Sequence, residues 1–428
     1  MTKINVDVHQ VTRVEGHGNI VLNAKDGTIE ELRWEVPESP RLFEAMLRGR
    51  YYEDVPIIAS RICGICSISH ATASIQATEA AFGIQPSEQT LLLRKLLFNA
   101  ETLESHVLHA YFLAAPDFLG AGSVFPLVET HKEAVVRALR LKKLAYNLAE
   151  LLAGRKTHPI SCMVGGFAKL PDPDGLKAMR GRLEDALPDL EATVELFKTL
   201  SIPDFVRETE YIALTDPAEY AFISGQVASS DAGVTPADRY LEVTNEFCVP
   251  HSTAKYTKNK RDSYMVGALA RFNINHGQLL PLARKAADDL GLSAPCHNPF
   301  MITVAQVVEC VHAAEDSLRI IDELLSRGLK EEANEVKPKA GRGVGVVEAP
   351  RGILFHDYNY DENGIMIKAN CIIPTNQNHN NIQKDMEGLV PVILSRPEDE
   401  IRLTLEMLVR AYDPCISCSA HMLHVSFK

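Results

Sequence analysis

Two pairs of cysteines, each with a spacing of three residues, are the strongest chemical signal in the sequence. Cys63 and Cys66 stand in RICGIC, and Cys415 and Cys418 stand in DPCISC near the other end of the chain. Two thiolates at this spacing can bind one metal ion from a single loop or first helical turn, and two pairs supply four sulfur ligands for a soft or borderline metal. The spacing alone is also typical of a structural zinc site, and a redox-active CxxC is a weaker alternative.

The surroundings of the pairs favour a catalytic metal over a structural zinc ion. A zinc ribbon closes within tens of residues and holds a small fold together, whereas this long chain has enough apolar residues for a core that needs no metal. The neighbours are also unusual for zinc, because Arg61 and His70 flank the first pair and Asp413 and His421 flank the second. The sequence therefore predicts that both ends of the chain contribute to one metal centre.

The motifs RxCGxCxxxH at Arg61–His70 and DPCxxCxxH at Asp413–His421 together resemble the large, catalytic subunit of nickel–iron hydrogenases. The resemblance points to the cytosolic, bidirectional group that includes the sulfhydrogenase alpha subunits. It extends over nearly the whole chain. Six further segments carry it: TRVEGHG at 12–18, FEAMLRGR at 43–50, HVLHAYFLAAPD at 106–117, GRKTHP with GG within 154–166, EAPRG at 348–352 and IIPT at 372–375.

The resemblance implies a role for each cysteine of the two pairs. Cys63 and Cys415 are expected as terminal nickel ligands, and Cys66 and Cys418 as bridges from nickel to an iron that also carries cyanide and carbon monoxide. Soft thiolates suit both metals. His70 is expected to donate a hydrogen bond to a bridging sulfur; without the resemblance, it would be interpreted as a core histidine in the first turn of a helix.

Heterolytic cleavage of H2 releases a proton inside a buried site, so the chemistry needs a base and a carboxylate within hydrogen-bond reach. The resemblance assigns this carboxylate to Glu15, beside Cys415, although on sequence alone a glutamate on an edge strand would face water. Arg351 is expected over the open face of the metals, paired with Asp117, where a fixed guanidinium stabilises developing charge. Taken alone, an arginine that follows proline in a turn is typical of the surface.

The resemblance also implies sites beside the four sulfurs. Thr375 and the backbone near Pro374 are expected to hydrogen-bond a cyanide, whereas a threonine in a short strand would ordinarily pack. Glu44, the backbone carbonyl of Cys371 and His421 are expected to bind a magnesium or iron ion near the C-terminus, since a hard cation prefers oxygen ligands. The simpler alternatives are a solvated helical glutamate and a histidine in the tail. The Cys371 thiol is expected to pack and not to bind metal.

Electrons released from H2 have no predicted acceptor within this polypeptide. The remaining five cysteines contain no CxxC pair, so no iron–sulfur cluster is expected in this chain. Three glycine clusters each lack the last glycine of GxGxxG, so no dinucleotide site is expected either. The resemblance implies a small partner subunit with iron–sulfur clusters, docked through a large permanent interface, and behind it flavin and iron–sulfur subunits that reduce NAD(P).

The segment after His421 indicates whether the C-terminus of the chain has been trimmed during maturation. Large subunits of this family are trimmed directly after that histidine once nickel is in place, and residues 422–428 follow it here. We therefore expect the chain to be in its unprocessed form, with nickel absent or the site immature. The alternative is a slightly longer native terminus.

The elements that must position these residues are mostly helical. Alternating residues around Asp26-Gly27 predict antiparallel strands over residues 1–35. Apolar residues at helical spacing predict long packed helices within a helical body at 40–335. A small sheet near 344–373 and a helix at 398–412 complete one expected domain of 428 residues. The four long helices are predicted over 87–115, 130–153, 176–200 and 302–329. The fold class is thus mainly α with small β-sheets (α+β), arranged around a buried metal site.

Composition narrows the possible partners. The chain has 428 residues, of which 46% are hydrophobic and 23% charged, with a net charge of −12. This acidic balance argues against nucleic acid or an anionic membrane as the main partner. No apolar run is long enough to span a membrane, and the start lacks a secretory signal, so we expect a cytoplasmic protein with free thiols.

Two functions of other classes remain as alternatives. The quinone-module subunit of respiratory complex I shares the fold of this family but has lost the cysteines, so the presence of all four here argues against it. A scaffold protein held together by a four-cysteine zinc site would contain stoichiometric zinc and no nickel, and would lose its fold on chelation.

Overall fold

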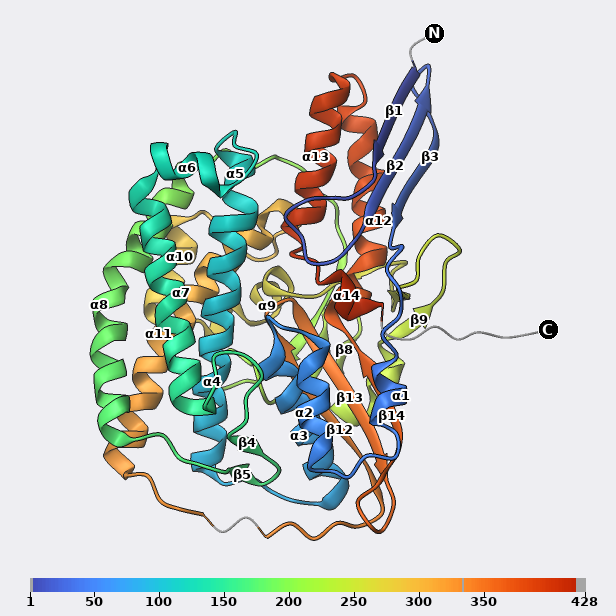
Figure 1. The fold of residues 1–428 in the computed structure, drawn as a ribbon. Coiled ribbons are helices and arrows are strands. Elements are labelled where there is room, and N and C mark those ends of the chain that lie inside the picture. Colours follow the sequence, from blue (N-terminus) through green and yellow to red (C-terminus); the bar gives the residue numbers. More distant parts are fainter. Residues whose placement is uncertain (1–2, 333–334, 421–428) are drawn as a thin grey trace, which may run out of the picture.

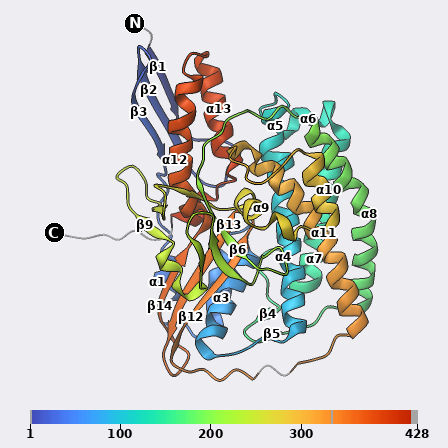
Figure 2. The same cartoon turned by 180° about the vertical axis from the view of Figure 1, so that it is seen from behind.

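The computed structural model describes residues 3–332 and 335–420. One half of the molecule is a bundle of long helices, and the other half holds three-stranded sheets and shorter helices (Figure 1; Figure 2). This arrangement is the α+β class that the sequence predicted.

The N-terminal sheet is antiparallel, in the order β1 (Lys3–Val8), β2 (Asn19–Lys25), β3 (Thr28–Glu35). Asp26 and Gly27 connect the last two strands with φ angles of 49° and 81°. Two positive φ angles are what a two-residue hairpin with the correct twist requires. The hairpin predicted at this dipeptide is confirmed.

Four long helices form the bundle, and all four predicted segments are confirmed. The helices are α4 (Glu88–Val107), α7 (Lys132–Ala153), α8 (Pro173–Lys198) and α11 (Ile302–Arg327). In α7 the buried residues recur at helical spacing, as in Leu141, Leu144 and Leu148, because one stripe faces the neighbouring helices. The shorter helices α5 (Ala115–Phe118), α6 (Val124–Thr130) and α10 (Pro281–Asp289) complete this half, and α9 (Ala268–Asn275) lies between the bundle and the sheets (Figure 1). Within the described ranges, no helix has both the length and the apolar character that crossing a bilayer would need.

A second antiparallel sheet consists of β12 (Gly341–Ala349), β13 (Gly352–Tyr360) and β14 (Met366–Ile372), at the place where the sequence predicted a short sheet. Helix α3 (Ser67–Phe82) lies directly against β12, with α1 (Phe43–Leu47) and α2 (Asp54–Ala59) nearby (Figure 1).

The contact between α3 and β12 depends on glycines at alternate positions of the strand. A Cβ added to Gly343 would lie 2.1 Å from the Ala77 carbonyl oxygen, and one added to Gly345 would lie 2.0 Å from that of Ala73. These distances are far below any van der Waals contact, so only glycine allows the helix backbone to approach this closely. The residues of α3 that face these glycines, Ala73 and Ala77, have only methyl side chains, so they too allow a close approach.

Helix α12 (Pro374–Ile393) is an element that the sequence analysis did not predict. Its first two turns are polar and yet buried, since Thr375, Asn376, Gln377, Asn378, His379, Asn380 and Asn381 are all in the interior. Hydrophobic periodicity could not reveal such a helix, because its buried face consists of side chains that hydrogen-bond neighbouring segments. The following helix α13 (Glu398–Ala411) is confirmed.

Several short elements join these parts. Short strands that were not predicted from the sequence form a four-stranded sheet in the order β11-β6-β7-β8. The short elements are β4 (Cys162–Met163), β5 (Gly166–Phe167), β6 (Glu210–Thr215), β7 (Gln226–Ser229), β8 (Gly233–Thr235), β9 (Asn245–Phe247), β10 (Tyr256–Lys258), β11 (Tyr264–Met265) and α14 (Ile416–Ser419).

We expect Gly343→Ala to lower the melting temperature of the purified chain markedly, because the added methyl forces α3 away from β12. Overpacking of this kind costs roughly 1–3 kcal/mol or more. Gly181→Ala is the control, since Gly181 lies in α8 with open space around its Cα. Alanine in a helix interior should be neutral or slightly stabilising there. Equal melting temperatures for Gly343→Ala and the wild type would show that the contact tolerates side chains.

Candidate metal centre

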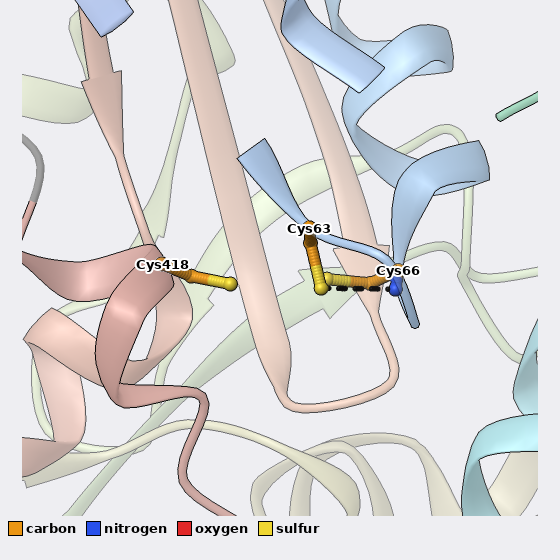
Figure 3. A group of neighbouring side chains, drawn as sticks. All are labelled: Cys63, Cys66 and Cys418. Atoms are coloured by element: carbon orange, nitrogen blue, oxygen red, sulfur yellow. Dashed lines mark hydrogen bonds between the residues drawn. The ribbon is translucent and has the colours of Figure 1, made fainter. Parts of the chain in front are cut away.

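Both cysteine pairs meet in the interior. Cys63 follows a short 3-10 turn, Cys66 precedes α3, Cys415 precedes α14 and Cys418 lies within it; all four side chains are buried. The Sγ atoms of Cys63 and Cys415 are 3.7 Å apart. The sulfurs of Cys63, Cys66 and Cys418 all lie within 4.8 Å of one another, and Figure 3 shows Cys418 pointing toward the first pair. The predicted convergence of the two ends of the chain is confirmed.

The state of the second pair differs from the prediction of free thiols. Cys415 and Cys418 form a disulfide in the structure, across a Cα–Cα distance of 5.4 Å, which lies within the usual disulfide range. The other seven cysteines are free. Because thiolates and not disulfide sulfurs bind metal, this pair must be reduced before it can act as a ligand. The donor set itself, four buried sulfurs from two segments, fits a thiolate-bound metal centre.

Glu15 lies beside the second pair, as predicted. Its carboxylate is within 4.8 Å of the sulfurs of Cys415 and Cys418. The Ser417 backbone N–H donates to Glu15 Oε2 at 3.1 Å, and the Ser417 hydroxyl donates to Oε1. The backbone of Glu15 also brackets Cys415, accepting from the Ile416 N–H at 2.9 Å and donating to the Pro414 carbonyl at 3.3 Å. These hydrogen bonds therefore fix the half-buried carboxylate next to the sulfurs.

Arg351 is also in the interior, but its partner is not the predicted one. Its Nε donates to the Asp413 carbonyl at 2.6 Å, and its Nη2 donates to Asp413 Oδ1 at 2.8 Å. The prediction of a pair with Asp117 is wrong. Asp117 accepts from Arg13, and from Arg410 at 2.7 and 2.9 Å, so its oxygens are already used. Asp413 is the partner instead, because it lies in the loop that carries the second cysteine pair.

The turn that carries Arg351 is held by a second buried arginine. Arg271 donates to the carbonyls of Ala349 and Pro350, each at 2.9 Å. Its remaining N–H groups go to the carboxylates of Glu309 and Glu348, so this fully buried cation is completely paired. This support could not be predicted from the sequence, since none of these residues belongs to a metal-binding motif.

Comparison with known proteins decides the family. A sequence profile of nickel-dependent hydrogenases matches residues 41–134 and 252–421. The chain is 33% identical over 422 residues to the alpha chain of Sulfhydrogenase 1 of Pyrococcus furiosus, covering 98% of both chains. It is 30% identical over 465 residues to a protein of the F420-non-reducing hydrogenase vhc of Methanococcus voltae, covering 99% of this chain and 96% of that protein. The chain belongs to the nickel-dependent hydrogenase family.

A solved structure supports the same assignment for the fold. An NAD+-reducing NiFe hydrogenase in the H2-reduced state matches with a TM-score of 0.86 and 26% identity, over 97% of this chain and 99% of that chain. The protein is thus the catalytic large subunit of a nickel–iron hydrogenase, an oxidoreductase that acts on H2. This assignment displaces the zinc-scaffold and quinone-module alternatives.

In this hydrogenase the two cysteines of the first pair are hydrogen-bonded to each other. The Cys66 backbone N–H donates to the Cys63 sulfur at 3.1 Å. A side-chain hydrogen bond from the Cys66 thiol lowers the pKa of Cys63, and the positive charge of Arg351 adds to this effect. The same side-chain bond, together with burial, raises the pKa of Cys66. One proton of the pair is therefore released more readily than the other.

Thr375 lies beside the second pair. Its hydroxyl oxygen accepts a hydrogen bond from the Cys415 backbone N–H at 3.0 Å. Pro374 and Thr375 occupy the first turn of α12 and not a short strand, where proline is favoured because the first helical N–H has no partner. The Thr375 contact thus brings the start of α12 to the second pair, while the predicted contact of Thr375 and the Pro374 backbone with a cyanide stays a prediction.

The predicted second metal site is only partly within the described residues. Glu44, in α1, accepts a hydrogen bond at Oε1 from the backbone N–H of Cys371 at 2.8 Å, so the structure brings these two predicted residues together. The Cys371 thiol is buried, and burial raises its pKa well above the usual range, which agrees with a packing role. His421 and the segment 422–428 lie outside the described residues.

Glu101 is a residue of the centre that the sequence analysis missed. From α4 it accepts hydrogen bonds from the N–H groups of Ile68, at 2.7 Å, and Ser69, at 3.0 Å, at the start of α3. Burial raises the pKa of this carboxyl from 4.5 to about 8. The one available signal was a glutamate on the apolar face of a predicted helix.

We expect Glu101→Gln to flatten the pH dependence of stability. Between pH 4.5 and about 8 the folded chain keeps a proton that the unfolded chain releases, so stability should fall as pH rises through this window and level off above it. Glutamine removes that contribution. Melting temperatures from pH 5 to 8 test this, with Glu129→Gln, an exposed residue of α6, as the control. Identical slopes for Glu101→Gln and the wild type would contradict the raised pKa.

Proposed function

We propose that this protein cleaves H2 heterolytically and reversibly at a centre held by Cys63, Cys66, Cys415 and Cys418, and passes the electrons to a partner protein. The observation that carries the proposal is the convergence of these four buried sulfurs from the two ends of the chain. When bound, a nickel–iron pair with cyanide and carbon monoxide on the iron would supply the electrophile that polarises H2. The protein supplies the thiolates, the proton acceptor and the fixed charges around them.

Glu15 receives the proton in this proposal. Its carboxylate is within 4.8 Å of two cysteine sulfurs, close enough for a thiol to pass a proton to it through one water molecule. The two hydrogen bonds from Ser417 keep the carboxylate aimed at the sulfurs. Glu15 is only half-buried, so a proton that it accepts can continue toward the surface.

Arg351 stabilises charge at the same centre. Its guanidinium is fixed by Asp413, and its Nη1 is a buried donor without a hydrogen-bond partner among the described residues. A buried N–H without a partner is costly, and a group bound over the sulfurs would satisfy it. With the metal group bound, His70 would donate a hydrogen bond to a cysteine sulfur of the centre, and Thr375 and the backbone near Pro374 would hold a cyanide. Asp117 supports the N-terminal segment through Arg13.

The electrons leave to a small partner subunit with iron–sulfur clusters, and from there pass to NAD(P) or a similar acceptor. Names of similar proteins support this, since one is the alpha chain of a sulfhydrogenase and another is an NAD+-reducing enzyme. Exposed apolar side chains lie just before the first cysteine pair, at Leu42, Met46 and Ile57, and suit a permanent interface near the centre. We place the assembly in the cytoplasm, and a magnesium or iron ion at Glu44, the Cys371 carbonyl and His421.

We expect Cys415→Ser to abolish H2-dependent dye reduction by the purified complex and to lower its nickel content, because an alcohol is a poor ligand for nickel. Metal analysis and dye reduction measure the two effects. Cys296→Ser, at a half-buried cysteine outside the centre, should retain both nickel and activity. Unchanged activity in Cys415→Ser would end the proposal.

We expect Glu15→Gln to keep the metal content of the complex while H2 oxidation falls by about 10²–10⁴-fold, the usual contribution of a positioned proton acceptor. Glutamine preserves the shape of the side chain and removes its basicity. Glu30→Gln, on the exposed side of β3, is the matched control and should leave the rate unchanged. A Glu15→Gln complex with the wild-type rate would require another proton acceptor.

A further inference from the structure

Behind the cysteine centre, three buried side chains form a row of hydrogen bonds between α3 and β13. His70 Nδ1 lies 3.1 Å from His356 Nε2, and His356 Nδ1 lies 2.5 Å from the Tyr358 hydroxyl. All three side chains are 0–1% exposed. Nothing in the cysteine motifs points to His356 or Tyr358, and the proposed function does not use them.

The row exists because α3 packs so closely on the sheet. In the strand register His356 lies opposite Gly345, whose missing side chain lets Ala73 of α3 approach. His70 is one helical turn before Ala73, on the same face of the helix. The glycine that admits the helix thus also brings the two imidazole rings together, with ring centroids 5.3 Å apart.

The chemistry of the three groups determines which group donates and which accepts in each hydrogen bond of the row. A neutral imidazole has one N–H donor and one acceptor nitrogen, and a tyrosine hydroxyl has a single proton to donate. The Tyr358 hydroxyl has two further neighbours, the Ser74 hydroxyl, which donates to it, and the Cys371 thiol, whose sulfur is a weaker acceptor than an imidazole nitrogen. We therefore assign the Tyr358 proton to His356 Nδ1. His356 must then hold its own proton on Nε2 and donate it to Nδ1 of His70. His70 in turn holds its proton on Nε2.

We propose that Tyr358 and His356 are positioning residues that hold His70 in the tautomer protonated at Nε2. The proposal rests on the proposed function, in which His70 donates to a bridging sulfur of the cysteine centre. With Nδ1 committed as an acceptor to His356, Nε2 is the ring nitrogen that carries the N–H. In the other tautomer, Nε2 would be an acceptor and would repel the electron-rich sulfur.

The test is a direct measurement of the tautomer. Solid-state 15N spectra of the full chain, labelled at histidine nitrogens, distinguish protonated from unprotonated ring nitrogens, and the loss of signals in His70→Asn assigns His70. In the wild type we expect the proton of His70 on Nε2. A wild-type His70 protonated at Nδ1 would overturn the proposal, and this result needs no variant of Tyr358.

The Tyr358→Phe variant tests whether the tyrosine hydroxyl determines which groups donate and which accept along the row. Without the hydroxyl, the hydrogen bond that keeps the His356 proton on Nε2 is lost, so we expect a second set of His70 signals from the form protonated at Nδ1. Tyr360→Phe is the matched control, because Tyr360 is also buried on β13 but bonds Thr78, at 2.8 Å, outside the row. An unchanged His70 spectrum in Tyr358→Phe would overturn the proposal, as would the same change in Tyr360→Phe.

Dye reduction by the wild-type complex separates this inference from the function on which it rests. If the complex does not oxidise H2, the proposed function fails whatever the tautomer. If it does and His70 is protonated at Nε2, we expect the Tyr358→Phe complex to lose activity severalfold while the Tyr360→Phe complex does not. Full activity in Tyr358→Phe, together with a mixed tautomer, would show that the row does not serve the centre.

Discussion

The structure depends on a clamp that the N-terminal segment forms around the loop of the second cysteine pair. The backbone of Glu15 bonds to that loop on both sides of Cys415, and Arg41 bonds to the carbonyls of Ser417, at 2.7 Å, and Ile62, at 2.5 Å. Ile62 precedes Cys63 and Ser417 precedes Cys418, so one guanidinium holds both halves of the centre. Hydrogen bonds from the main chain and from Arg41 therefore set the positions of the sulfurs. These bonds are made by groups other than the four sulfur atoms.

Much of the fold and of the centre could be predicted because local patterns encode it. The Asp26-Gly27 turn, the four long helices and the sheet after residue 341 each leave a periodic or turn signal within a few residues. The cysteine pairs were recognisable because their spacing and flanking residues form a specific motif. Helix α12 could not be predicted, since its buried face is polar and its partners lie on segments distant in sequence.

The partners of charged groups were the least predictable part. Arg351 bonds to Asp413, not Asp117, and the choice depends on which carboxylates are already occupied by Arg13 and Arg410. Which carboxylate each arginine pairs with depends on the three-dimensional arrangement of the charged groups, and the spacing of these residues along the sequence does not reveal it. The Cys415–Cys418 disulfide likewise could not be predicted, because the CxxC spacing allows either a bond between the two sulfurs or one metal ion bound by both.

The distance in sequence between the cysteine pairs has a consequence for how the protein is made. Cys415 follows Cys63 by 352 residues, so at a synthesis rate of about 5–20 residues per second roughly 20 to 70 seconds pass between their translation. During that interval the growing chain carries only half of its sulfur donors. A metal captured then would be held by two thiolates and exposed to exchange. Loading of the complete centre must therefore wait until the second cysteine pair has been made.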